Sequence, residues 1–266
     1  MTITVLGNSL RFDILCDKLI SAGYSVTRCT HTDEIPEVLE DDVIILPIPS
    51  KAKDGFLNLS GEKKITIETL IERTRSDALI ITCNYLDTRR KIIDINKDEY
   101  FAFLNAVPTA EGAISIALKS KGLTMYNSKC LIVGFGRIGK ILAHRLDGLK
   151  ADISVAARNP KDLALIKALG LKDIKTTDLD KASLNYDVIF QTVPALVLNE
   201  NLLKSLNKDC LIVELSSASA GTDLEKAKEL SINVISAGGL PEKTAPITAG
   251  MILFESVIRI ITDTNN

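Results

Sequence analysis

Short runs of β-branched residues alternate with longer stretches of helical periodicity along most of this chain, and the alternation predicts βαβ units with parallel sheets. The runs fall into two series. The first comprises residues 3–7, 24–28, 42–48, 78–83 and 90–95, and the second comprises residues 129–134, 152–158, 186–193, 209–216 and 232–238. We therefore expect an α/β fold of two Rossmann-like domains, which a chain of 266 residues is long enough to form.

A helix is predicted to connect the two series. Its sequence is NAVPTAEGAISIALKS, and we place it at residues 106–122. Pro108 suits a first helical turn, and the apolar residues that follow it share one face. The helix separates an N-terminal substrate-side domain, residues 1–105, from a nucleotide-binding domain, residues 123–244.

The end of the chain predicts one more helix. Residues 245–266 include APITAGMILFESVIRII, in which Ile252, Leu253, Val257 and Ile260 recur at helical spacing. A helix with so apolar a face has to pack against another surface, and we expect it to cross back to the first domain.

Charge and composition exclude several classes of protein. The 32 Lys and Arg nearly balance the 34 Asp and Glu, so a net charge of -2 creates no global field to hold nucleic acid or an anionic membrane. No apolar run approaches the roughly twenty residues of a membrane helix, and we expect a cytoplasmic protein. The five cysteines form no CxxC pair and no cluster with histidine, which favours buried thiols and no metal site.

The stretch KCLIVGFGRIGK carries the clearest chemical signal. Its glycines form G-x-G-x-x-G directly after a strand and at the start of a helix, the arrangement that binds a dinucleotide pyrophosphate at the helix N-terminus. The alternative is a glycine-rich turn without a ligand. The predicted pyrophosphate-binding residues are Gly134, Phe135, Gly136, Arg137, Ile138 and Gly139.

The next strand of this domain indicates which nucleotide is bound. It ends ISVAARNP and offers no carboxylate for the ribose 2′-hydroxyl of NAD. Ala157, Arg158 and Asn159 stand at that end instead, and the Arg158 guanidinium suits a 2′-phosphate. NADP is favoured, NAD is possible, and a solvated surface arginine is the alternative.

Later strand ends supply further candidates. Thr192, Val193 and Pro194 follow a strand where dinucleotide domains border the nicotinamide, although a simple turn is the alternative. Ser216, just after Glu214 on the next strand, is the preferred contact there.

The remaining features are mostly absences. The first domain has no glycine fingerprint, so its strand ends are either part of a substrate cleft or plain turns. Only His31 and His144 occur, so no imidazole beyond residue 144 can act as the acid or base of a hydroxy-acid dehydrogenase. No metal-hydrolase or serine-hydrolase motif is present.

Several motifs together resemble a particular family. NAVPTAEGAISIAL, LIVGFGRIGK, VAARNP, QTVPALVL, ELSSASAGTD and GGLPEKTAPITAG, with DEIPEVLEDDVIILPIPS in the first domain, are similar to the A subunit, the dehydrogenase component, of dipicolinate synthase from spore-forming bacteria. The resemblance implies oxidation of a dihydrodipicolinate-level intermediate to pyridine-2,6-dicarboxylate with NADP. It also implies that the flavoprotein-like B subunit of dipicolinate synthase is the partner, and we expect a homo-oligomer.

The resemblance also implies the substrate residues. Asn105, Pro108, Thr109 and Gly112 would face the substrate and nicotinamide. Glu111 is the candidate catalytic proton acceptor, with Ser216 or a water as alternatives. A plain charge at the helix N-terminus is an equally open interpretation of Glu111.

Two departures from the family pattern each remove a positive charge. A basic residue followed by Pro-Gly-Gly is expected where this chain has Ala218 to Gly221, and a lysine is expected at Ile247. Either Lys243, Arg89 or Arg90 compensates, or the substrate differs, or the family charges are only structural. Two other functions remain open: a reductase of another 2-hydroxy or 2-keto acid, and a non-catalytic protein that binds NADP(H) as a regulatory component.

Overall fold

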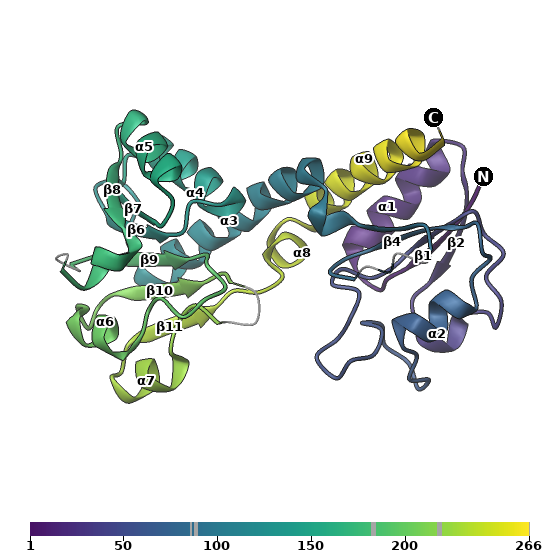
Figure 1. Cartoon of the computed structure of the whole chain (residues 1–266), viewed down its shortest axis with the longest axis horizontal. Helices are drawn as coiled ribbons and strands as arrows, with labels where there is room; N and C mark the ends of the chain where they lie inside the picture. Colours follow the sequence, from purple (N-terminus) through teal and green to yellow (C-terminus); the bar gives the residue numbers. More distant parts are fainter. Residues whose placement is uncertain (86, 88–89, 182–184, 217–219, 266) are drawn as a thin grey trace. The chain divides into compact units, whose positions relative to one another are not determined.

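The computed structural model describes residues 1–85, 87, 90–181, 185–216 and 220–265, and it divides into two compact units (Figure 1). The first unit is Met1–Asn105 with Ala245–Asn266, and the second is Ala106–Thr244. Each unit is built on one parallel sheet flanked by helices. The predicted fold class is thereby confirmed.

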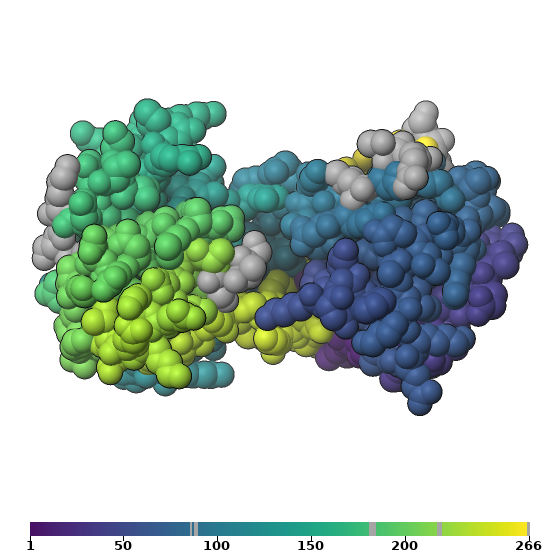
Figure 2. Space-filling model, turned by 60° about the horizontal axis from the view of Figure 1, so that its bottom comes forward, coloured from purple at the N-terminus to yellow at the C-terminus, as the bar shows by residue number. Residues whose placement is uncertain are grey.

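The first unit has a five-stranded sheet in the order β2-β1-β3-β4-β5. Its strands are β1 (Thr2–Leu6), β2 (Ser25–Cys29), β3 (Val43–Ile45), β4 (Leu79–Thr82) and β5 (Ile92–Asp94). Its helices are α1 (Leu10–Ser21), α2 (Ile67–Glu72) and α9 (Pro246–Asn265), with short 3-10 turns at Thr32–Glu34 and Ile95–Lys97. The long connection between β3 and α2 lies at the surface (Figure 2, dark blue), anchored by the buried side chains of Leu57 and Ile65.

The C-terminal helix completes the core of the first unit, as predicted. Leu253 and Val257 of α9 are fully buried in one cluster with Leu15 and Leu19 of α1. The two helices approach closely at Gly250, where an added Cβ would lie 2.6 Å from the Ile14 Cβ and 2.7 Å from a backbone oxygen. Removing α9 would therefore expose an apolar face of α1.

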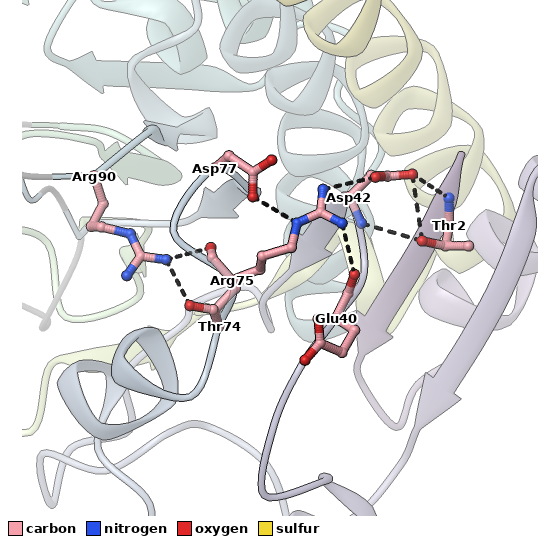
Figure 3. A network of polar contacts seen from close by, with 7 residues as sticks. All are labelled: Thr2, Glu40, Asp42, Thr74, Arg75, Asp77 and Arg90. Carbon is pink, nitrogen blue, oxygen red and sulfur yellow. Dashed lines mark hydrogen bonds and ion pairs between the residues drawn. The ribbon is translucent and has the colours of Figure 1, made fainter.

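A polar network fixes the amino ends of the central strands in this unit (Figure 3). Arg75, before β4, donates to the Asp42 and Asp77 carboxylates at 3.0 and 2.6 Å. Asp42 also accepts from the backbone N–H of Thr2 at 2.8 Å. That hydrogen bond, followed by the one from Arg75, holds the pKa of Asp42 below its usual range.

The second unit has a six-stranded sheet in the order β11-β10-β9-β6-β7-β8. The strands are β6 (Lys129–Val133), β7 (Asp152–Ala157), β8 (Lys172–Lys175), β9 (Val188–Gln191), β10 (Leu211–Glu214) and β11 (Asn233–Ser236). Its helices are α4 (Arg137–Gly148), α5 (Pro160–Ala168), α6 (Glu200–Ser205), α7 (Leu224–Glu229) and α8 (Leu240–Thr244), with a 3-10 segment at Thr176–Lys181.

The connecting helix, α3, runs from Glu99 to Lys121 and thus begins before the predicted start at residue 106. The prediction that Pro108 lies in the first turn is wrong, because Pro108 lies inside the helix. The true start is marked by Asp98, whose carboxylate accepts from the backbone N–H of Phe101 at 2.8 Å, and Phe101 itself is buried in the core of the first unit. The helix tolerates the proline at the cost of one backbone hydrogen bond.

The same helix is long and apolar enough to cross a membrane by length and composition alone. Just over half of it is buried within the protein, and Ala110, Ala113 and Ala117 belong to the core of the second unit. A core helix passes the same test of length and composition, so α3 is weak evidence for a membrane span.

All five cysteines are buried free thiols, as the sequence predicts. Burial raises the pKa of Cys83, Cys130 and Cys210 to about 12 and that of Cys16 to about 11. These thiols therefore stay protonated in the folded chain at pH values where the thiols of an unfolded chain ionise.

This difference predicts a loss of stability at alkaline pH. Because the unfolded chain releases its thiol protons first, the stabilising contribution is complete below pH ~9 and is lost as the pH rises toward ~12. Urea unfolding at pH 8 and pH 10.5 should show a smaller decrease in the free energy of unfolding for Cys83→Ala than for the wild type. An identical decrease in both proteins would contradict the prediction.

Candidate nucleotide and substrate sites

The turn between β6 and α4 needs all three of its glycines, each for a different reason. Gly134 has a φ of 101°, and a Cβ there would lie 2.5 Å from the Thr192 Oγ1. A Cβ on Gly139 would lie 2.2 Å from the Gly134 backbone oxygen, so only glycine lets α4 pack this closely on β6. Gly136 faces open space and leaves room for a ligand beside the backbone.

The first turn of α4 is exposed to a ligand through its backbone. The N-cap, Gly136, has no side chain to satisfy the free N–H groups of the helix. Phe135 and Ile138 pack into the core of the second unit, so these two predicted residues can meet a phosphate only through their backbone. Free N–H groups at a helix N-terminus suit a pyrophosphate.

The end of β7 presents one available cation. Ala157 is buried as the last residue of the strand, and Asn159 caps α5 by accepting from the Lys161 backbone N–H at 2.9 Å. Arg158 is exposed, and no described residue binds its guanidinium. Of the three predicted residues here, Arg158 is the one with an exposed cationic side chain.

The segment after β9 is held by side-chain hydrogen bonds in addition to those of its backbone. Thr192 donates from its backbone N–H and from its hydroxyl to the Val133 carbonyl, at 3.0 and 2.8 Å, and so joins the ends of β9 and β6. The Val193 N–H donates to the Gln191 side chain at 3.1 Å, whereas Pro194 is exposed. With its proton engaged, the Thr192 hydroxyl is left to accept a hydrogen bond from a ligand.

At the end of β10, Ser216 is hydrogen-bonded to the Glu214 carboxylate. The Glu214 Oε1 accepts from the Ser216 backbone N–H at 3.0 Å and from its hydroxyl at 2.5 Å. Both residues are buried. Ala218, where the family pattern predicts a basic residue, lies outside the described residues.

The predicted substrate residues on α3 share one side of the helix but differ in their surroundings. Asn105, Pro108, Thr109 and Gly112 fall within about 100° of the helical wheel. Asn105 accepts from the Arg11 guanidinium at 2.7 Å. Gly112 packs against α8, since a Cβ there would lie 2.8 Å from the Thr244 hydroxyl. The Gly112 position therefore serves packing rather than an open ligand surface.

Glu111, the predicted catalytic proton acceptor, is engaged in an ion pair. Glu111 is exposed in the middle of α3, and its Oε1 accepts from the Arg145 Nε at 2.9 Å. Arg145 lies in the last turn of α4, about 12 Å along the helix axis from the glycine turn. Glu111 is not a charge at a helix N-terminus, because α3 begins at Glu99.

Two of the three cations expected to compensate for the missing family charges, Arg90 and Lys243, donate hydrogen bonds to backbone carbonyls. Arg90 donates to the backbone carbonyls of Ile71, Thr74 and Arg75 at 3.3, 2.9 and 2.6 Å, the last two drawn in Figure 3. Lys243 donates to the Gly238 carbonyl at 2.8 Å. Arg89 lies outside the described residues, and Ile247 is exposed.

Sequence reasoning missed Arg11. This arginine lies in the first turn of α1, directly after the turn that follows β1, and only 3% of its surface is exposed. Because α1 follows the carboxyl end of β1, Arg11 lies toward the carboxyl end of the sheet. The available signal was an arginine in the apolar run LRFDILC, because a charged side chain is rarely buried unless another group binds it.

The fold and the glycine turn define a nicotinamide-nucleotide-dependent dehydrogenase. Residues 108–220 match the NAD binding domain of the D-isomer specific 2-hydroxyacid dehydrogenases. The chain is also 30% identical to the dipicolinate synthase A subunit of Bacillus subtilis over 93% of its length and 86% of that protein. It belongs to the family of dipicolinate synthase A subunits.

Solved structures agree with this assignment. The crystal structure of the dipicolinate synthase A subunit from Bacillus halodurans has a TM-score of 0.86 at 25% identity and covers 97% of both chains. The corresponding structure from Bacillus subtilis has a TM-score of 0.85 at 26% identity, with 99% of this chain and 96% of that chain covered. D-lactate dehydrogenase from Escherichia coli, at 16% identity and a TM-score of 0.67, shares the fold and covers 100% of this chain and 97% of its own.

Proposed function

We propose that this dehydrogenase oxidises a dihydrodipicolinate-level intermediate to pyridine-2,6-dicarboxylate, with NADP as the hydride acceptor, in spore formation. The observation that supports this proposal most is the likeness to the Bacillus subtilis protein over 93% of the chain. It includes both units rather than the nucleotide-binding unit alone.

The site residues fit a nicotinamide nucleotide. The backbone of the Gly134 to Gly139 turn would hold its pyrophosphate, and Arg158 would hold the 2′-phosphate. Bound NADP supplies a ring carbon that takes a hydride. The chain itself mainly has to orient the substrate and exclude water, because aromatisation of the product ring drives the oxidation.

A dicarboxylate substrate also needs a cation, and Arg11 is the best-placed candidate in the first unit. Its guanidinium is buried and oriented by the Asn105 side chain. Guanidinium groups bind carboxylates through two parallel hydrogen bonds. In this proposal Asn105 acts on the substrate through Arg11, while Thr109 and Pro108 stay candidate contacts.

We further propose that the protein is cytoplasmic, forms a homo-oligomer and works with the flavoprotein-like B subunit. The relative in Bacillus subtilis is itself described as one subunit of a synthase, and this supports the expectation of a partner.

A coupled assay tests the function. The purified chain is incubated with the lysine-pathway synthase, its substrates and NADP, with and without the B subunit, while NADPH and dipicolinate are followed by absorbance. Formation of both supports the proposal. Turnover of a 2-hydroxy or 2-keto acid instead would identify another reductase, although no histidine beyond residue 144 is present to serve it. Bound nucleotide without any turnover would indicate a non-catalytic binding protein.

Arg158→Asp should switch the nucleotide preference. Loss of a charge-assisted contact worth about 1.5–3 kcal/mol weakens NADP binding roughly 10- to 100-fold, while NAD, which lacks the 2′-phosphate, should bind almost unchanged. Calorimetric titration with both nucleotides measures this. Lys161→Asp, which makes the same charge change on the neighbouring helix, is the matched control. Equal weakening of both nucleotides by Arg158→Asp would contradict the assignment.

A further inference from the structure

Glu214, the last residue of β10, is a buried carboxylate that is only half satisfied. Just 1% of the residue is exposed. One oxygen, Oε1, accepts two hydrogen bonds from Ser216, as described above. The other oxygen, Oε2, is buried as well and has no hydrogen-bond partner within the described chain.

Glu214 and Ser216 lie at the carboxyl end of the sheet, the end that also carries the nucleotide-binding turn. Glu214 pairs in register with Gln191 of β9, and Gln191 pairs with Val133, the residue before the glycine turn. The Gln191 amide is fixed at both ends, donating to the Gly221 carbonyl at 2.8 Å and accepting from the Val193 N–H. In open parallel sheets, ligands bind outside the carboxyl ends of the strands where the strand order reverses, here between β6 and β9.

A purely structural role explains Oε1 but not Oε2. The bonds from Ser216 to Oε1 close a tight turn after the strand, and a neutral glutamine or asparagine would close it as well. Burying a carboxylate is costly unless its oxygens are bonded. A free carboxylate oxygen beside an engaged hydroxyl instead provides acceptor capacity for one more proton.

We propose that Ser216 and Glu214, rather than the ion-paired Glu111, form the proton relay of the oxidation. This inference rests on the proposed function. With NADP bound, a substrate dihydropyridine ring would lose a hydride to the nucleotide and a proton to the Ser216 hydroxyl oxygen, while the original Ser216 proton would pass to the Glu214 Oε1 that already accepts its hydrogen bond. The ring becomes aromatic, the serine is unchanged, and the glutamate becomes neutral until solvent takes its proton. Ser216 is the catalytic group that meets the substrate, and Glu214 acts through it.

Two substitutions separate the relay from a structural role. Glu214→Gln keeps the size of the side chain and an oxygen to accept from Ser216 but cannot take a proton. Ser216→Ala removes the hydroxyl, and Ser216→Thr keeps it. Loss of a general base lowers turnover by roughly 100-fold or more, so Glu214→Gln and Ser216→Ala should both lose this factor, with NADP affinity nearly unchanged. Ser216→Thr should recover part of the rate.

Three further readouts test the relay itself in the full chain, with the B subunit where turnover requires it. Wild-type turnover should depend on pH and slow in D2O. Both effects should disappear in Glu214→Gln. In a single turnover, the infrared band of a protonated carboxyl should appear in the wild type and be absent from Glu214→Gln.

The outcomes distinguish the two levels of the proposal. An active wild type whose rate and pH profile survive both Glu214→Gln and Ser216→Ala would overturn the relay and leave the proposed function standing. If Glu214→Gln fails to fold, a wild-type rate in Ser216→Ala would by itself overturn the relay. A wild type that forms no dicarboxylate with or without the B subunit would overturn the function and the relay together.

Discussion

Gly139→Ala is expected to abolish nucleotide binding. The new Cβ would lie 2.2 Å from the backbone oxygen of Gly134, and neither atom belongs to a flexible side chain. Because real Cβ atoms do not come so close, α4 has to move away from β6 and takes its N-terminal N–H groups with it. Binding that depends on placing those groups against a pyrophosphate should weaken by at least 100-fold, about 2.7 kcal/mol. Fluorescence titration with NADPH measures the loss.

The control for this experiment lies on the same helix. Gly148 is the last residue of α4, and a Cβ there would meet nothing within 4 Å. Gly148→Ala should therefore bind nucleotide normally and be as stable as the wild type or slightly more so. Nucleotide affinity that is preserved in Gly139→Ala would show that the turn does not hold the pyrophosphate.

Leu253→Ala should strongly destabilise the first unit. Leu253 of α9 is fully buried in the cluster that α9 shares with α1 and the sheet. Truncating a buried leucine leaves a cavity and costs about 3–5 kcal/mol. Because that is a large part of the stability of a typical domain, urea unfolding followed by circular dichroism should show an early transition for this unit.

An exposed residue of the same helix gives the comparison. Met251 is 42% exposed and loses little packing on truncation, so Met251→Ala should change the free energy of unfolding by less than about 1 kcal/mol. If both variants unfold alike, α9 does not stabilise the first unit as its packing indicates.

The β-branched runs were enough to predict most of both sheets, because central strands such as β3, β9 and β10 are buried along their whole length and consist mostly of apolar residues. The strand that went unpredicted is β8, whose sequence KDIK has one apolar residue. It forms the edge of its sheet, where only one neighbour is needed and charged side chains stay in water. Hydrophobic pattern carries no signal for such a strand.

The candidate site also has a part that the sequence predicts and a part that it does not. The glycine turn is a motif of residues close together in the sequence, so its spacing was enough to predict it. Glu111 and Glu214 could not be distinguished locally. The partner of Glu111, Arg145, comes from a neighbouring helix, and the burial of Glu214, whose partner Ser216 is two residues away, depends on the surrounding sheet. Arg11 was equally hidden, since its burial depends on elements far away in sequence, including Asn105.

The packing of α9 on α1 also sets an order of events during synthesis. The first unit joins residues up to Asn105 with residues from Ala245 onward, and the whole second unit is translated in between. Until the final helix leaves the ribosome, the apolar face of α1 has no permanent cover. The second unit, continuous in sequence, can fold by itself in that interval. The N-terminal unit is thus the first to be made and the last to be finished.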